Sequence, residues 1–454
     1  MKNGQTTNTQ LEKNQYMSSN QISLKTAFLY WLKLGFISFG GPAGQIALMH
    51  ADLVEKRRWI SEARFLHALN YCMLLPGPEA TQLAIYIGWL MHKTRGGIMA
   101  GLLFVLPGFL VLILLSWIYM RFGNHEIVKI IMSGVKPAVV AIVLTAAWRI
   151  ARRSLKTKLL MAVATMAFLS ISFLHLPFPV IILSAAVTGL VFRHACEAHH
   201  PSANAPGLAS QAHPAALIDD DTPTPAHAHF SLVRLLMTVG LSILSVVAVW
   251  LLLATAFGTT GPLTDMANFF SKAAMLSFGG AYAVLPYMVQ AAVEQYHWLN
   301  MAQMMDGLAL GETTPGPLIM IVAFVGFIGG WNNELFGANH LLLSACLGAG
   351  VAFFFTFFPS FVFILAGGPL VEASRNNLRL NAPLNAISAA VVGVILSLAW
   401  LFAGNVFFHE GTQIDLFAVG ITVTASVATF RYQVSTIKLL AACALAAYGL
   451  SLFH

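Results

Sequence analysis

The chain has 454 residues, of which 57% are hydrophobic and only 9% charged, and its mean hydropathy is +0.74. Soluble domains carry about 25% charged residues, so this composition excludes a soluble globular protein and predicts an all-α polytopic membrane protein. The formal net charge of +7 comes mostly from lysines and arginines in loops, as the positive-inside rule expects, and it does not argue for a nucleic-acid partner.

Six apolar segments are expected in a first unit, residues 24–193, at 24–50, 64–92, 97–120, 130–150, 158–174 and 178–193. The preceding residues 1–23 are polar and show no signal-peptide pattern, so we expect a cytoplasmic N-terminus there. Six more segments are expected in a second unit, residues 258–454, at 266–290, 303–330, 340–366, 384–404, 413–430 and 437–453.

Between the units lie a linker, residues 194–230, and one extra apolar segment at 231–257. The linker is rich in His, Pro and Ala and has few bulky apolar residues, which predicts a flexible cytoplasmic segment. Its six histidines leave a metal-sensing role open, although their spacing is irregular. The four cysteines show no metal or redox spacing, so no metal site is predicted.

The two units are predicted to be homologous copies. Ser38-Phe39-Gly40-Gly41 matches Ser277-Phe278-Gly279-Gly280 at an offset of 239 residues. Pro76-Gly77-Pro78 matches Pro315-Gly316-Pro317 at the same offset. Farther on the offset becomes 252, where "AVVAIVLTAAW" matches "AVVGVILSLAW". Repeats of this length favour a transporter with a substrate site between the copies.

Six segments plus one linking helix make an odd number, about 13 in all, so the second copy should enter the membrane from the opposite side as an inverted repeat. With a cytoplasmic N-terminus and a periplasmic C-terminus, 16 loop lysines and arginines fall inside and 6 outside. Four of the six form one cluster: Lys56, Arg57, Arg58 and Arg64. Either the topology fails at this cluster, or the cluster concentrates anions at a mouth of the pathway.

Adjacent glycines interrupt a membrane helix in both copies, at Gly40-Gly41 and at Gly279-Gly280. Glycine tolerates the dihedrals of a break, and Pro42 suits the first turn of a resumed helix. The free N–H groups of that helix would attract an anion. Close packing of small residues is the alternative explanation.

The two Pro-Gly-Pro motifs cannot continue a regular helix. Irregular backbone at membrane depth is tolerated where protein or a water-filled cavity surrounds it, so Pro76, Gly77, Pro78, Pro315, Gly316 and Pro317 are candidate substrate-binding residues. Thr313 and Thr314 add hydroxyl groups before the second motif. A simple proline kink is the alternative.

Charged residues inside the apolar runs are further candidates. Lys33 and Lys272 are matched positions, each seven residues before the first glycine of its pair, and could attract an oxyanion or instead extend toward the membrane surface. Glu79 and Glu312 flank the Pro-Gly-Pro motifs and are candidates for coupling to protons.

Phe39-Gly40-Gly41-Pro42, the first Pro-Gly-Pro, "FGGAYAVLPYM" and "TTPGP" together resemble the chromate ion transporter family in its long, two-domain form. The resemblance implies export of chromate through a bacterial inner membrane, chromate resistance, and halves of opposite orientation. Its motifs fall on Phe39, Gly40, Gly41, Pro42, Pro76, Gly77, Pro78, Phe278, Gly279, Gly280, Pro315, Gly316 and Pro317.

We therefore expect a secondary transporter for a tetrahedral dianion, chromate or a relative such as sulfate. A passive anion channel built on the same broken helices is the second hypothesis. An intramembrane chromate reductase is the third, but the sequence has no haem or flavin motif and no hydrolase signature, so no enzyme activity and no cofactor are expected. The lipid bilayer is the expected surrounding, and the sequence leaves homo-oligomerisation, coupling ion and transport direction open.

Overall fold

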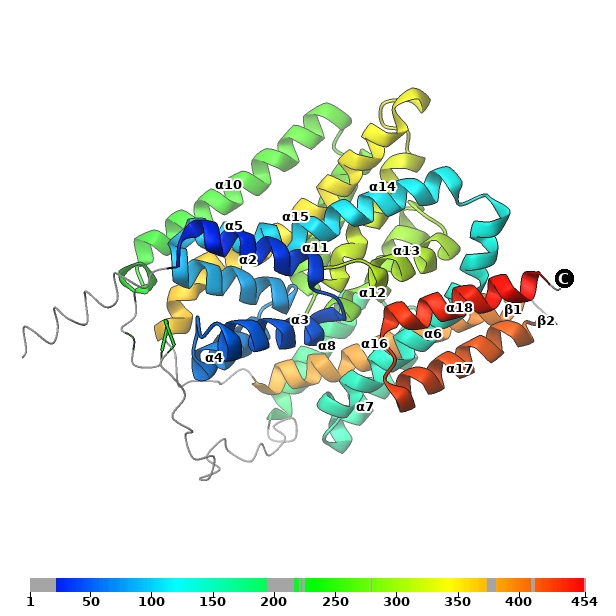
Figure 1. Ribbon diagram of the computed structural model, residues 1–454, viewed down its shortest axis with the longest axis horizontal. Coiled ribbons are helices and arrows are strands. Elements are labelled where there is room, and N and C mark those ends of the chain that lie inside the picture. Colours follow the sequence, from blue (N-terminus) through cyan, green and yellow to red (C-terminus); the bar gives the residue numbers. More distant parts are fainter. Residues whose placement is uncertain are drawn as a thin grey trace, which may run out of the picture.

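The computed structural model describes residues 22–193, 216–219, 222, 225–278, 280–373, 381–409 and 413–452. Helices make up most of these parts, and the two strands among them, β1 (Phe408–His409) and β2 (Gln413–Ile414), form a short ladder. Five of their helices are long and apolar enough to cross a membrane: Glu79–Phe122, Glu126–Ser154, Leu232–Phe257, Ala338–Leu370 and Pro383–Phe407. The prediction of an all-α membrane protein is confirmed (Figure 1).

In the first unit the helices are α2 (Leu24–Ile37), α3 (Gly41–Met49), η1 (His50–Lys56), α4 (Glu62–Cys72), α5 (Glu79–Phe122), α6 (Glu126–Ser154), α7 (Lys158–Ser172) and α8 (Phe178–Val191). The linker contributes η2 (Ala226–Ala228), and α10 (Leu232–Phe257) follows it. Figure 1 shows α10 along one edge of the molecule, and its most apolar window has no buried residue.

In the second unit the elements are α11 (Pro262–Leu276), α12 (Ala281–Val289), η3 (Gln290–Gln295), α13 (Met301–Thr313), η4 (Leu318–Met320), α14 (Ile321–Asn332), η5 (Ala338–His340), α15 (Leu341–Ala373), α16 (Asn381–Phe407), α17 (Leu416–Tyr432) and α18 (Thr436–Ser451). The sequence match extends to the backbone. Arg58 and its match His297 both have positive φ, 54° and 51°, and both follow a π-helical turn, η1 or η3.

The expected segments 24–50 and 64–92 are not single crossing helices. The chain reverses at Gly40-Gly41: the ring of Trp59, beyond η1, lies 4.9 Å from the ring of Tyr30 in the middle of α2, which a helix continuing straight past the glycines could not reach. The chain reverses again at the Pro-Gly-Pro motif. This follows from Nε2 of His92, which comes after this motif and lies 2.8 Å from the carbonyl oxygen of Ile22, just before α2. Each segment is thus a hairpin of two short helices with its break at the tip.

The long α5 is itself bent back on itself at His92 and Lys93, which have non-helical dihedrals. Its parts 79–91 and 94–122 pack closely, since a Cβ atom on Gly88 would lie 2.5 Å from the carbonyl oxygen of Gly96. In the second unit α14 and α15 pack in the same way, at Gly326 and Gly348. Small residues permit such close approach of membrane helices.

The two units are interleaved around α5 and α15, which run antiparallel. Gly101 faces Phe361, while the rings of Phe109 and Phe353 lie 4.4 Å apart. Outside this pair, α6 packs against α17 and α18, and α16 packs against α7 and α8. The hydroxyls of Thr145 and Thr429, 2.8 Å apart and buried, join α6 to α17. One continuous core therefore holds both sets of hairpin tips.

Candidate functional site

Each Pro-Gly-Pro tip of one unit meets the Gly-Gly tip of the other. The N–H of Gly77 donates to the carbonyl oxygen of Ser277 at 3.2 Å, and the N–H of Gly316 donates to that of Ser38 at 2.9 Å. Gly77 and Gly316 are matched positions, and so are Ser38 and Ser277. We call these two contacts the Gly77 crossing and the Gly316 crossing.

The Gly-Gly tips need glycine because of their backbone. Gly40 and Gly41 have φ of 90° and 69°, and Gly280 has φ of 97°, a region that other residues adopt at a cost of roughly 1–2 kcal/mol. A Cβ atom on Gly41 or Gly280 would meet nothing within 4 Å, so space lies open beside both tips. Gly279 lies outside the described residues.

Two buried glutamines, which the sequence analysis did not select, support the crossings. Gln45 of α3 donates through Nε2 to the carbonyl oxygens of Ser38 and Gly316. Gln82 of α5 donates to the carbonyl oxygen of Pro76 at 2.8 Å. Their matches are Val284 and Ile321, so comparing identical positions could not find them. In the sequence, the only sign of their role is that each is a polar amide side chain within an apolar segment.

Lys33 and Lys272 are not brought to the crossings. Lys33 is exposed and shares the outer face of α2 with exposed Leu29, Phe36 and Ile37. The opposite face of α2, which carries Leu34 and Ser38, is buried. Lys272 is likewise exposed on α11.

The carboxyl candidates do lie beside the tips. Glu79 is the first residue of α5, directly after Pro78. Glu312 accepts a hydrogen bond from the Tyr282 hydroxyl at 2.5 Å, which ties α13 to the first turn of α12. The hydroxyls of Thr313 and Thr314 donate back to the carbonyl oxygens of Leu310 and Gly311, both at 2.8 Å, so their protons are already engaged.

The basic cluster lies at the same end of the molecule as the start of α2. The Arg57 guanidinium lies 4.9 Å from the centre of the Tyr30 ring, and exposed Lys56 pairs with Asp52 at 3.7 Å. Arg64 is buried and donates to the carbonyl oxygen of Thr222 in the linker. The first hairpin therefore brings this cluster back to the end of the molecule at which α2 starts, whereas a single helix crossing over 24–50 would have placed it at the opposite end.

Two buried acidic residues away from the tips were also missed. Asp306 of α13 accepts from the Tyr119 hydroxyl at 2.8 Å and pairs with Lys136 at 3.6 Å. Glu372 of α15 accepts from the Tyr86 hydroxyl. Both contacts join one unit to the other, so they hold the units together at positions remote from the tips.

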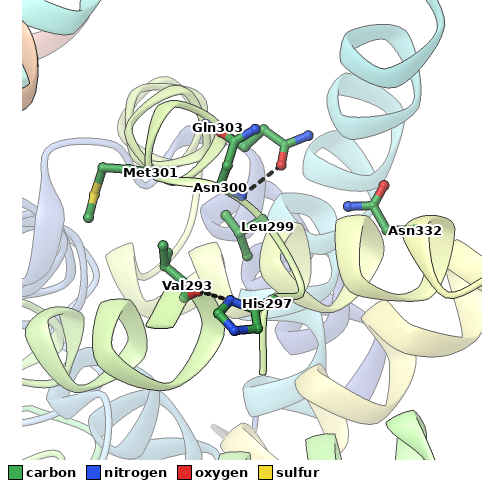
Figure 2. Close-up of a pocket in the computed structure, with 7 residues that line it drawn as sticks. All are labelled: Val293, His297, Leu299, Asn300, Met301, Gln303 and Asn332. Atoms are coloured by element: carbon green, nitrogen blue, oxygen red, sulfur yellow. Dashed lines mark hydrogen bonds between the residues drawn. The ribbon is translucent and has the colours of Figure 1, made fainter. Parts of the chain in front are cut away.

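The hollow drawn in Figure 2 has a volume of about 400 Å³ and is not at the crossings. It is lined by Val293, His297, Leu299, Asn300, Met301, Gln303 and Asn332. Side chains of the second unit hydrogen-bond the backbone groups around this hollow. The side-chain amide of Asn332 donates to the carbonyl oxygen of Trp298 at 2.9 Å, and the N–H of Asn300 donates to the side-chain oxygen of Gln303 at 2.9 Å.

In the first unit the positions that match Asn332 and Gln303 are occupied by Lys93 and Arg64. There the backbone of the linker makes the two hydrogen bonds that the Asn332 and Gln303 side chains make in the second unit. The N–H of Ile218 donates to the carbonyl oxygen of Trp59 at 3.1 Å, and the carbonyl oxygen of Ile218 accepts from the N–H of Ser61 at 3.0 Å. The Ile218 side chain is buried. Residues around Ile218 are thus paired with the loop that contains Ile60, whereas the sequence predicted a flexible segment.

The described residues hold no group of three or more His, Cys, Asp or Glu side chains arranged for a metal ion. The site consists of backbone N–H groups, neutral side chains and two carboxyls, which is suited to holding an ion reversibly.

A family model described as chromate transporter matches residues 25–190 and again residues 264–448. The chain belongs to the chromate transporter family. A probable chromate transport protein of Synechococcus elongatus is 28% identical over 404 residues, 89% of this chain and 90% of that protein. Chromate transport proteins of Pseudomonas aeruginosa and Cupriavidus metallidurans are 32% and 28% identical, each over 82% of this chain and over 80% and 81% of their own lengths. No solved structure matches.

The two matches to the chromate transporter family cover the two units one by one and leave out the linker and α10. Both crossings lie within the matched ranges, so the family's own repeating unit supplies one Gly-Gly tip and one Pro-Gly-Pro tip.

Proposed function

We propose that this chromate transporter family member is a secondary active transporter that exports chromate, or a related tetrahedral oxyanion such as sulfate, from the cytoplasm. Residence in a bacterial inner membrane and a role in chromate resistance are part of the proposal. The observation that carries it is the meeting of four irregular tips in two crossings between the units, since broken helices at a repeat interface are where transporters bind ions.

In this mechanism the tips replace part of the hydration shell of the ion. Helix N-termini at Gly41, Ala281 and Glu79 begin at the tips, and their first N–H groups have no partner within the helix. Such groups and the helix dipole favour an anion. Relative movement of the units would part the crossings first toward one side and then toward the other.

The proposed topology is an inverted repeat with the N-terminus and linker in the cytoplasm and the C-terminus in the periplasm. Antiparallel packing of α5 and α15 supports it. The returning hairpins also move Lys56, Arg57, Arg58 and Arg64 to the cytoplasmic side, so the loop charges become 20 inside and 2 outside. This cluster would raise the local concentration of anions where they enter.

Glu79 and Glu312 are the proposed coupling groups. A carboxylate and a dianion repel one another, so a carboxyl beside the tips links the binding of a proton to that of the substrate. Glu79 is closer in sequence to the irregular backbone, whereas Glu312 is held by Tyr282. The Glu79→Gln variant should still move the oxyanion down its concentration gradient, but it should no longer accumulate the oxyanion when a proton gradient is applied.

The test is uptake of chromate, sulfate and molybdate into inside-out membrane vesicles, with and without a proton gradient. We expect gradient-driven accumulation of at least one tetrahedral oxyanion. Passive equilibration that ignores the gradient would indicate a channel, and the absence of flux for all three ions would contradict oxyanion transport.

A further inference from the structure

The two crossings are matched in backbone but not in the side chains around them. A Cβ atom on Gly77 would lie 2.7 Å from both the Gln82 Nε2 and the Ser360 Oγ atoms. At the Gly316 crossing the residues that match these two are Ile321 and Gly108. The nearest atoms to a Cβ on Gly316 are carbons, of Gly108 at 3.8 Å and of Met320 at 3.9 Å.

The polar groups at the Gly77 crossing have hydrogen-bonding capacity to spare. The hydroxyls of Ser360, Thr356 and Thr81 are buried and have no partner among the described residues. Other buried helix hydroxyls, such as those of Ser116 and Thr145, donate to the carbonyl of the preceding turn. A buried polar group without a partner costs roughly 1–3 kcal/mol and indicates a bound water or ligand that completes it.

Donor capacity separates the two crossings further. Gln82 gives one amide hydrogen to Pro76 and retains a second one. Gln45, at the Gly316 crossing, donates to two carbonyl oxygens, so it offers only its oxygen, which cannot bind an anion. Thr81 and Thr356 are matched by Met320 and Phe104, so the Gly316 crossing offers no comparable hydroxyl.

We propose that the chain binds one tetrahedral oxyanion, at the Gly77 crossing, with the Ser360 hydroxyl and the free amide hydrogen of Gln82 as donors. Thr81, next to Gln82 on α5, and Thr356, one turn before Ser360 on α15, add hydroxyls on the same side, and the Gly316 crossing, which offers no spare donor, acts as a seal. The inference rests on the proposed function and deepens it. Ser360 and Gln82 are 1% and 0% exposed, so the ion reaches them only when the Gly77 to Ser277 contact opens.

The experiment measures chromate and sulfate binding to the whole detergent-solubilised chain by titration calorimetry. The wild type should bind one ion per chain. Ser360→Ala, and Gln82→Ile, which copies the matched residue, should each weaken binding at least tenfold, because hydrogen bonds to charged groups are strong. Ser116→Ala, the same change at a buried serine whose hydroxyl is bonded to Leu112, should stay within twofold of the wild type.

Ser360→Thr keeps a hydroxyl and should restore binding, which a merely structural role of the serine would not require. Two ions per chain, or unchanged affinity in Ser360→Ala and Gln82→Ile, would overturn the single-site inference while leaving oxyanion transport standing. If the folded wild type bound and transported none of the ions, the proposed function itself would fail, and the inference would fail with it.

Discussion

The backbone N–H of Gly316 in the second unit donates to the carbonyl oxygen of Ser38 in the first, and Gly77 and Ser277 repeat the contact with the units exchanged. Both partners are backbone groups at irregular tips, so the contacts survive most side-chain changes. They depend instead on how closely the tips approach. Substitutions that change this approach should therefore affect the protein more than substitutions of exposed side chains.

Gly108 of α5 leaves room for the Gly316 tip. A Cβ atom there would lie 2.1 Å from the carbonyl oxygen of Pro315, so Gly108→Ala must displace backbone, at a cost of roughly 1–3 kcal/mol. We expect a lower melting temperature of the purified protein. Gly350→Ala in α15 is the control, because a Cβ there meets nothing within 4 Å. Equal stability of the two variants would contradict the close crossing.

Gly40 is required for its dihedrals and not for space. Its φ is 90°, and the nearest atom to an added Cβ is 3.9 Å away. Gly40→Ala should therefore cost roughly 1–2 kcal/mol of backbone strain and reduce oxyanion flux, with the protein still present in the membrane. Gly240→Ala in α10, where a Cβ meets nothing, should leave flux unchanged. Normal flux in Gly40→Ala would show that the tip geometry is dispensable.

The sequence predicted the breaks but not the reversals. Hydropathy and glycine show where a helix is interrupted, and they do not show whether the chain continues or returns. Two signals favoured a return: a helix over 24–37 spans about 21 Å, short of the 30 Å core, and the cluster at Lys56 to Arg64 violated the charge rule. Ser360 and Gln82 could not be predicted from identities shared by the two copies, because these residues differ from their matches.

The reversals can be tested by labelling single cysteines with a membrane-impermeant maleimide in a cysteine-free background. Lys25→Cys and Arg57→Cys, both exposed, should react from the same side. His125→Cys, beyond the end of α5, should react from the other side. Labelling of positions 25 and 57 from opposite sides would restore a crossing helix over 24–50.

Exposed and buried members of the basic cluster should differ in salt dependence. Lys56→Gln removes an exposed charge, so flux should fall more at low salt than at physiological ionic strength, where screening acts within about 8 Å. Arg64→Gln removes a buried group that holds Thr222, and its loss should persist at all salt concentrations. A salt-independent defect in Lys56→Gln would argue against a role in concentrating anions.

The bound part of the linker should protect amides in hydrogen exchange. Ile218→Asp places a charge in a buried position, which is strongly unfavourable, and should release the segment. Exchange should then accelerate in peptides containing Ser61 and Ile218, whose N–H groups are bonded in the wild type. His229→Asp adds the same charge at an exposed linker position and should leave exchange unchanged. Rapid exchange already in the wild type would contradict a bound linker.

The most direct measurement is an experimental structure of the chain with tungstate, a tetrahedral dianion whose heavy atom is located unambiguously. We expect one tungsten position per chain, at the Gly77 crossing and within hydrogen-bonding distance of Ser360 and Gln82. A tungstate ion bound only in the hollow lined by His297 and Asn332 (Figure 2), or only beside Lys33 and Lys272 on the outer faces of α2 and α11, would contradict it.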